Sequence, residues 1–311
     1  MPRIAIIDPL TLLGREISAE FRHQWPNEGD LLFFHAAEDE EHQVTQIGGH
    51  AALVPPLTDP GDLDSCEAVV LTTEIGSDRL DVFDRLLENR SNLLFLDASR
   101  LERYNHLTHP AIDADGLASG NRLRLAHPSI AVAGILTEAL RAFSPERMTI
   151  AAIDPVSTYG KHAIDLLARQ AVHRLQGETV KDLLDGQLLA FNMAAQGGKS
   201  LTEEAASLLP NLHVAATRTI GSSFHGHLIL LGFGFEEIVD PDQINDCLEQ
   251  TRGVLIASPP VNLDAITDRN EIVITPPAIS PDGRTVAIQA TVDGTRIGGA
   301  LTAATIFQGL M

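Results

Sequence analysis

The sequence is poor in cysteine and lacks long apolar runs. Cys66 and Cys247 are the two cysteines among 311 residues. So sparse a pair excludes a disulfide framework and is typical of a reduced, cytosolic protein. No apolar run approaches the roughly 20 residues needed to span a bilayer. The strand pattern that starts at Arg3 leaves no room for a secretory signal peptide, so we expect a soluble, cytoplasmic protein.

Basic residues are also scarce, because 22 Lys and Arg stand against 42 Asp and Glu, giving a formal net charge of −20. This balance argues against binding to nucleic acid or to an anionic membrane surface. It disfavours an anionic ligand as well, unless basic residues gather locally. Neither an H-x-x-x-H nor a C-x-x-C spacing occurs, so no metal site is expected. If His225 and His227 lie on a strand, both rings point to one face, which is a weak candidate for adventitious metal only.

What the first 125 residues do contain is an alternation of strand and helix patterns. Short apolar runs predict strands at 3–8, 31–35, 68–72 and 93–97, and helical periodicity predicts helices at 10–25 and near 78–88. This alternation is typical of a parallel sheet covered on both faces. It predicts a doubly wound domain of the nucleotide-binding type.

The pattern changes beyond residue 120. Helices are predicted at 129–143 and 159–175, strands at 148–154, twice within 211–235 and twice within 271–292, and a closing helix at 296–310. A Pro281-Asp282-Gly283 turn joins the last two strands. Helices interleaved with antiparallel strand pairs predict an α+β second domain.

Five segments resemble, in order, the aspartate-semialdehyde dehydrogenase family and the related N-acetyl-glutamyl-phosphate reductases. They are IIDPLTLLGRE, LLFLDASR, PVSTYGKHAIDLLARQ, LLAFNMAAQGG and VDGTRIGGALTAATIFQGL. The resemblance runs from the first strand to the last helix. It implies an α/β fold with a Rossmann-like domain at residues 1–127 plus 294–311 and an α+β dimerisation domain at 128–293. The C-terminal helix returns to the first domain.

The family reaction, reductive dephosphorylation of an acyl phosphate through a thioester, needs a cysteine thiolate at a helix N-terminus. Aligning the family pattern N-P-N-C-S-T on Pro128 puts Ile130 at the nucleophile. Cys66 precedes a strand and Cys247 lies in a helix of the second domain, so neither replaces it. Ser129 is the nucleophile only in a shifted alignment, and a helix N-cap explains this serine better. The sequence therefore offers no nucleophile for the thioester mechanism.

The family cofactor is NADP, and the loop that would bind it is altered. Matching V-G-A-T-G-x-V-G-R-E on Gly14 leaves Asp8 and Thr11 where the first two glycines belong. Those glycines permit the tight turn and the close approach of backbone to pyrophosphate, and a carboxylate there repels the diphosphate. Gly14 is explained by close packing of helix on strand. We expect no cofactor.

Further family positions have changed together: Gly160, Gly294 and Ile297 replace polar residues of the pattern. Other pocket positions are retained. Arg218 fits the arginine that grips the substrate carboxylate. The family histidine follows that arginine by seven residues, which selects His225, but it also sits in a Gly-His pair, which selects His227.

A second set of residues matches the family pocket more loosely. It consists of Arg100, Asn192, Gln196 and either Glu203 or Glu204. Arg100 matches an anion-contacting arginine, and a glutamate matches the carboxylate that binds the substrate amine. Solvated or ion-paired side chains explain the charged residues equally well, and buried amides that hold a loop explain Asn192 and Gln196.

Three hypotheses follow. The first is a non-catalytic paralogue, similar to the Usg-type proteins, that acts as a homodimer or by binding a partner such as a related dehydrogenase subunit. The second is a binding protein for a small carboxylate or phosphate, held in the old substrate crevice by Arg218 and Arg100. The third is a working NAD(P)-dependent semialdehyde dehydrogenase that uses a different reactive residue.

Overall fold

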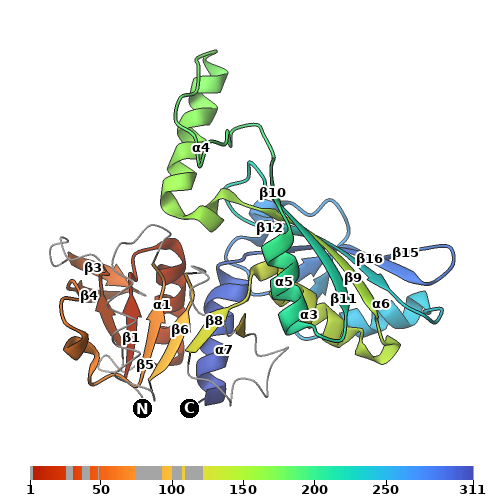
Figure 1. Ribbon diagram of the computed structural model, residues 1–311, viewed down its shortest axis with the longest axis horizontal. Coiled ribbons are helices and arrows are strands. Elements are labelled where there is room, and N and C mark those ends of the chain that lie inside the picture. The colour runs from red at the N-terminus through yellow and green to blue at the C-terminus, as the bar shows by residue number, and fades with distance from the viewer. Residues whose placement is uncertain are drawn as a thin grey trace. The chain divides into compact units, whose positions relative to one another are not determined.

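The computed structural model describes residues 3–25, 31–36, 43–47, 49–73, 93–99, 107–108 and 122–310. The helix predicted near 78–88 and the candidate Arg100 lie outside these residues. The chain divides into two compact units (Figure 1). Unit 1 comprises residues 1–126 and 299–311, and unit 2 comprises residues 127–298. The sequence predicts boundaries after residues 127 and 293.

Unit 1 is built on a parallel sheet, as the sequence predicts. Among its described residues the strand order is β2 (Leu31–Phe34), β1 (Ile4–Ile7), β5 (Ala68–Leu71), β6 (Leu94–Asp97), β8 (Arg122–Leu125) and β7 (Leu107–Thr108). Each neighbouring pair is parallel. Every residue of β1 and β5 is buried, which is why these strands are continuous apolar runs in the sequence.

Two helices of unit 1 pack together although they come from opposite ends of the chain. They are α1 (Leu12–Gln24) and α7 (Leu301–Leu310). Phe21 and Phe307 meet edge to face with ring centroids 5.1 Å apart. The predicted return of the C-terminal helix to the first domain is thus confirmed. The predicted helix at 296–310 begins with a π-helical turn, Arg296–Ala300. A hairpin of β3 (Gln43–Ile47) and β4 (His50–Val54) is not predicted by the sequence.

Unit 2, which is described throughout, has an eight-stranded mixed sheet. Its order is β10 (Ala194–Gly197), β11 (His213–Ile220), β9 (Arg147–Asp154), β12 (His227–Gly234), β16 (Thr285–Val292), β14 (Ile272–Ile274) and β13 (Val254–Ile256), with β15 (Ala278–Ile279) pairing with β16. The α+β prediction is confirmed, but the consecutive strands β11 and β12 do not pair with each other. β9 lies between β11 and β12, parallel to the first and antiparallel to the second.

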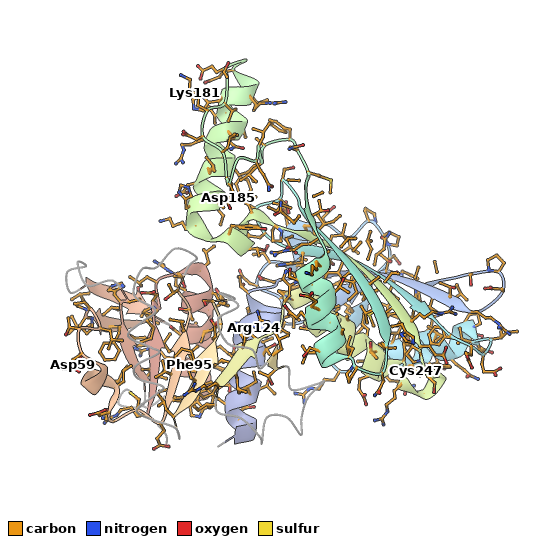
Figure 2. The ribbon with its side chains drawn as sticks, in the orientation of Figure 1. Asp59, Phe95, Arg124, Lys181, Asp185 and Cys247 are labelled. Carbon is orange, nitrogen blue, oxygen red and sulfur yellow. The ribbon has the colours of Figure 1, made fainter. Side chains whose placement is uncertain are left out.

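The helices of unit 2 are α3 (Pro128–Ala139), α4 (Gly160–Leu175), α5 (Lys199–Leu208) and α6 (Pro241–Glu249). α3 contacts β9 and β12, α5 contacts β11, and α6 contacts β13 (Figure 1). The helix predicted at 129–143 ends at Ala139, and a 3-10 turn at Arg141–Phe143 follows. Figure 2 labels Lys181 and Asp185 on the segment that runs back along α4. Gln170 holds this segment, because its amide nitrogen donates to the carbonyl of Asp182 over 2.7 Å.

No helix in the described part of the chain is both long enough and apolar enough to cross a membrane.

Candidate functional site

Strand alternation brings charged residues together on the helix-covered face of the unit 2 sheet. In β9, Ile150, Ala152 and Asp154 alternate and are buried. Since successive side chains point to opposite faces, Asp154 shares the inner face with these apolar residues. Arg218 lies between two buried positions of β11, and His227 begins the buried series of β12. The three side chains therefore meet where the three central strands come together.

His127 completes this group from the start of α3. Its Nε2 lies 3.3 Å from Oδ2 of Asp154, and Nε2 of His227 lies 3.7 Å from Oδ1. The two imidazole rings stand edge to face with centroids 5.9 Å apart. Nε of Arg218 donates to Oδ2 of Asp154. We call Asp154, His127, His227 and Arg218 the Asp154 cluster.

The electrostatics of the Asp154 cluster favour an ionised carboxylate. Burial raises the pKa of Asp154, but His127, His227 and Arg218 outweigh that effect and hold the pKa well below its ordinary 3.8. Burial lowers the pKa of Arg218, and the Asp154 carboxylate reverses this and raises it. The Asp154 side chain is completely buried, whereas a quarter of the Arg218 side chain is exposed. The charge of the arginine is thus largely balanced within the protein.

The start of α3 is where the thioester nucleophile would stand. Pro128 occupies the first helical turn, and the preceding His127 is the N-cap. Nδ1 of His127 accepts from the backbone N–H of Ser129 over 3.2 Å and lies 2.8 Å from its Oγ. The interpretation of Ser129 as the N-cap is therefore wrong, because it is the second residue of the helix. Ser129 and Ile130 are both fully buried.

Two glycines close the space over the start of α3. A Cβ on Gly294 would overlap the imidazole of His227 and lie 2.9 Å from Cγ of Pro128. Gly298, at φ 78°, would place a Cβ 2.9 Å from Cα of Pro128. A polar side chain at 294 has no room, since the ring of His227 fills that volume. The segment that carries Gly294 and Gly298 therefore packs tightly against Pro128 at the start of α3.

Neither cysteine lies at this helix start. Cys66 is buried in the unit 1 core beside Leu63 and Val69. Cys247 lies on α6, where Figure 2 labels it, and α6 contributes no residue to the Asp154 cluster. Next to Ile130 in the chain, the Ser129 hydroxyl lies 2.8 Å from Nδ1 of His127, so both can exchange a proton at this helix start.

The loop between β1 and α1 is closed by its own hydrogen bonds. The carboxylate of Asp8 accepts from the N–H of Ala36 over 2.7 Å and from the Thr73 hydroxyl over 2.5 Å. Thr11 is the N-cap of α1, and its Oγ1 accepts from the N–H of Gly14 over 3.0 Å. A helix-start N–H that would otherwise face a phosphate therefore already has a partner.

Gly14 has the packing role that the sequence suggests. A Cβ at this position would lie 2.7 Å from Oγ1 of Thr11 and 2.7 Å from Oγ1 of Thr72. Thr72 directly follows β5, so a side chain at Gly14 would push α1 away from the sheet. Close helix–strand contact is sufficient to explain this glycine.

The two candidate histidines have different surroundings. β12 begins at His227, so His225 precedes the strand and is exposed. The suggested pair of rings on one strand face is therefore not formed. His227 is 4% exposed and has Oγ1 of Thr158 3.3 Å from its Nε2. The histidine of the Gly-His pair, rather than the one selected by spacing, contacts Asp154.

The remaining predicted pocket residues do not all converge. Glu204, on α5, accepts a hydrogen bond from the backbone N–H of His127, whereas the exposed Glu203 pairs with Lys199 at 3.8 Å. Asn192 and Gln196 are candidate pocket residues, with buried amides as the alternative, and both are exposed. Their side chains donate to the carbonyl of Leu188 and to Oε1 of Gln187, respectively. Within unit 2, which is described throughout, neither has a hydrogen bond to the Asp154 cluster, and Gln196 lies on the edge strand β10.

Sequence reasoning did not single out His127 or Asp154. His127 stands next to the proline that carries the nucleophile motif, and Asp154 immediately precedes the V-S-T-Y segment. A signal was therefore present, because a charged residue that ends a buried strand is almost never fully buried without a partner. Its partners lie 27, 64 and 73 positions away, which no local spacing rule detects.

Comparisons with known proteins agree with this fold. No protein-family model matches the sequence. The USG-1 protein homolog of Azotobacter vinelandii is 27% identical over 118 residues, which is 34% of this chain and 35% of that protein. The match to this curated relative thus spans about a third of its length.

Solved structures match over nearly the whole chain. Aspartate semialdehyde dehydrogenase II of Vibrio cholerae has a TM-score of 0.86 and 19% identity, with 100% of this chain and 98% of that chain covered. A probable aspartate-semialdehyde dehydrogenase of Pseudomonas aeruginosa has a TM-score of 0.86 and 18% identity, with 99% and 98% covered. The enzyme of Francisella tularensis scores 0.82 at 13% identity, with 99% of each chain covered. The chain therefore has the aspartate-semialdehyde dehydrogenase fold along its full described length.

Proposed function

We propose that this protein is a non-catalytic relative of the aspartate-semialdehyde dehydrogenases, which keeps the fold and acts through dimerisation or partner binding. The observation that carries the proposal is the start of α3. By the family alignment, a fully buried Ile130 stands where the reaction needs a thiolate, and Gly294 and Gly298 bring the chain against Pro128, two residues before it. An isoleucine side chain offers neither a nucleophile nor a proton.

The cofactor loop supports the same conclusion independently. Dinucleotide binding in the Rossmann mode uses helix-start N–H groups and a loop without side-chain obstruction. Here the Thr11 hydroxyl already accepts a hydrogen bond from the N–H of Gly14, and the carboxylate of Asp8 lies at the carboxyl end of β1. Since this side chain is 17% exposed, a diphosphate placed there would meet a negative charge.

The first test is thermal unfolding with and without NADP, NAD and phosphate. We expect no shift with either nucleotide, whereas binding at a hundredfold excess over the dissociation constant would stabilise the protein by about 2.7 kcal/mol. An active aspartate-semialdehyde dehydrogenase in the same buffer controls for nucleotide quality. A clear rise with NADP would contradict the proposal. A rise with phosphate alone would instead favour the small-anion binding protein.

Two variants separate the missing nucleophile from the altered loop. Ile130→Cys supplies the thiol, and Asp8→Gly with Thr11→Gly restores the two loop glycines. We expect neither change alone to give NADPH-dependent reduction of an acyl phosphate. Activity in Ile130→Cys alone would show that the cofactor site is intact, so the cofactor part of the proposal would be wrong.

The homodimer is proposed from the resemblance together with the open face of the unit 2 sheet. The face of β9, β11 and β16 opposite the helices carries small exposed side chains, among them Thr149, Ala215, Thr217 and Ala287. Small residues let a second sheet approach closely. We expect Ala287→Arg to shift sedimentation from dimer to monomer, while Ala206→Arg on α5 leaves it unchanged. A wild-type monomer at micromolar concentration would contradict the homodimer and leave a different partner.

A further inference from the structure

We propose that His127, Asp154 and His227 form a binding site for one divalent transition-metal ion of the zinc type. The site lies in unit 2, so it does not depend on the cofactor loop of unit 1. The proposal goes beyond the loss of catalysis, because a metal at this position would make the Asp154 cluster a structural or ligand-binding centre.

The geometry satisfies the first requirement of a metal site. One potential ligand atom from each of the three residues lies within 4.8 Å of the other two, and all three residues are buried. The ligands come from the start of α3, the end of β9 and the start of β12. Three rigid elements thus hold them, which fixes their separation before any ion arrives.

The carboxylate supplies a second, independent observation. Oδ2 of Asp154 accepts from Arg218, whereas Oδ1 is fully buried and accepts no hydrogen bond. A buried acceptor left in this state is costly, and native structures seldom tolerate one. Oδ1 is available as a monodentate ligand while Arg218 keeps the carboxylate in position through Oδ2.

The surroundings of His127 allow its Nε2 to bind a metal. In the structure Nδ1 accepts from the N–H of Ser129, so a metal at Nε2 requires the ring proton to move to Nδ1, and metal-binding histidines usually donate that proton to an outer partner. Oγ of Ser129 lies 2.8 Å from Nδ1 and can accept it. Glu204, hydrogen-bonded to the His127 backbone, adds negative charge beside the cluster and offsets part of the charge of Arg218.

The ligand set determines which ion is expected. Two imidazoles and one carboxylate suit zinc and neighbouring transition metals, whereas calcium and magnesium prefer oxygen ligands alone. Three protein ligands leave a fourth position for water or for a small ligand. With its side chain a quarter exposed, Arg218 marks the side of the cluster that solvent reaches.

The test begins with full-length protein purified without a metal-affinity column and treated with a chelator. Zinc is titrated by calorimetry, and cobalt(II) is added to a second sample to record its visible absorption. We expect one zinc per chain and cobalt bands of a four- or five-coordinate site. Correctly folded protein that binds neither ion would overturn the proposal.

A matched pair of variants identifies the ligands. His227→Gln removes a proposed ligand, and His225→Gln removes the exposed histidine two residues away. We expect zinc affinity to fall in His227→Gln by more than the roughly 10- to 100-fold that the loss of an outer-shell partner costs. His225→Gln should bind as the wild type does. Equal binding by both variants, or a loss confined to His225→Gln, would place the ion at the surface and overturn the site.

X-ray absorption on the wild type covers the case in which His227→Gln does not fold. We expect two imidazoles and oxygen ligands around zinc, at distances of about 2.0–2.2 Å. One imidazole or none, or sulfur in the first shell, would contradict the assignment.

Discussion

The helix starts of α1 and α3 differ in the groups that surround them. At α1, Thr11 caps the helix, and an N–H and a hydroxyl hold Asp8. At α3, His127 caps the helix and also faces a buried carboxylate, a second histidine and an arginine. The start of α1 is completed by neutral hydrogen-bond donors, whereas the start of α3 also lies against charged side chains from β9 and β11.

The difference shows that two helix starts on one fold can satisfy their N–H groups in different ways. A helix N-terminus whose N–H groups already have partners gains little from a bound anion. A buried ionic cluster contains polar groups that need charged or hydrogen-bonding partners, so it offers an ion or a polar ligand more than the capped loop does. The following changes test this contrast, from the largest expected effect to the smallest.

Asp154→Ala should be the most destabilising change, because it leaves His127, His227 and Arg218 buried without their counter-charge. Breaking a buried pair in this way costs about 3–5 kcal/mol of unfolding free energy. Urea unfolding followed by circular dichroism, with chelator present, measures the loss. The exposed Asp165→Ala on α4 is the control and should unfold like the wild type. Equal stability of the two variants would show that the Asp154 cluster is not a stabilising centre.

Gly294→Ala tests how closely the chain covers the start of α3. The added methyl group overlaps the His227 ring and forces a local shift. Overpacking of this kind costs about 1–3 kcal/mol. Gly309→Ala is the matched control, because no atom lies within 4 Å of its added Cβ and the residue is helical. It should leave stability unchanged or raise it by at most about 1 kcal/mol. If Gly294→Ala left the unfolding free energy unchanged, the segment around residue 294 would be free to move away from His227.

Thr11→Ala tests the capped loop of unit 1. Losing the hydroxyl that accepts from Gly14 should lower stability by about 1 kcal/mol, the usual cost of an N-cap. Thermal unfolding of Thr305→Ala, an exposed threonine in α7, provides the comparison. If Thr11→Ala instead raised NADP affinity with no loss of stability, the helix start would be a masked phosphate site and the contrast with α3 would fail.

Ionisation of Tyr159 should have the smallest effect on stability. It reports on how well the side chains beside the Asp154 cluster are buried. Burial raises its pKa above the ordinary 10.0, while Arg218, 5.7 Å from the ring centroid, acts in the opposite direction. The neutral phenol therefore contributes stability that is present below pH 10 and is lost as pH rises through the raised pKa. The difference in tyrosinate absorbance between wild type and Tyr159→Phe isolates this group from Tyr104. Ionisation at or below pH 10 would contradict the burial of this side chain.

The sequence predicts the fold well because the local patterns are strong. The buried strands β1 and β5 are continuous apolar runs, and the motif segments appear in order along the whole chain. It does not predict which strands become neighbours in unit 2. Nothing in the local pattern of 211–235 indicates that β9 inserts between β11 and β12, since strand order depends on tertiary packing.

The candidate site is predictable only in part, for the same reason. Proline alignment places Ile130 at the nucleophile position, and Arg218 is identified by its motif. The role of His127 as a helix cap and the position of Asp154 depend on contacts between distant segments. Asn192 and Gln196 are pocket candidates because their motif is retained, yet both side chains are exposed, since a retained residue type does not determine burial.

The antiparallel pairing of β12 with β9 has a consequence for folding fidelity. Leu228 stands opposite Ile153, and this register sends His227 to the inner face beside Asp154. A slip of one residue would turn His227 to the outer face, since side chains alternate along a strand. Asp154 would then be buried without the imidazole of His227 beside it. The contact between His227 and Asp154 thus favours the observed register of β12 on β9 over registers shifted by one residue.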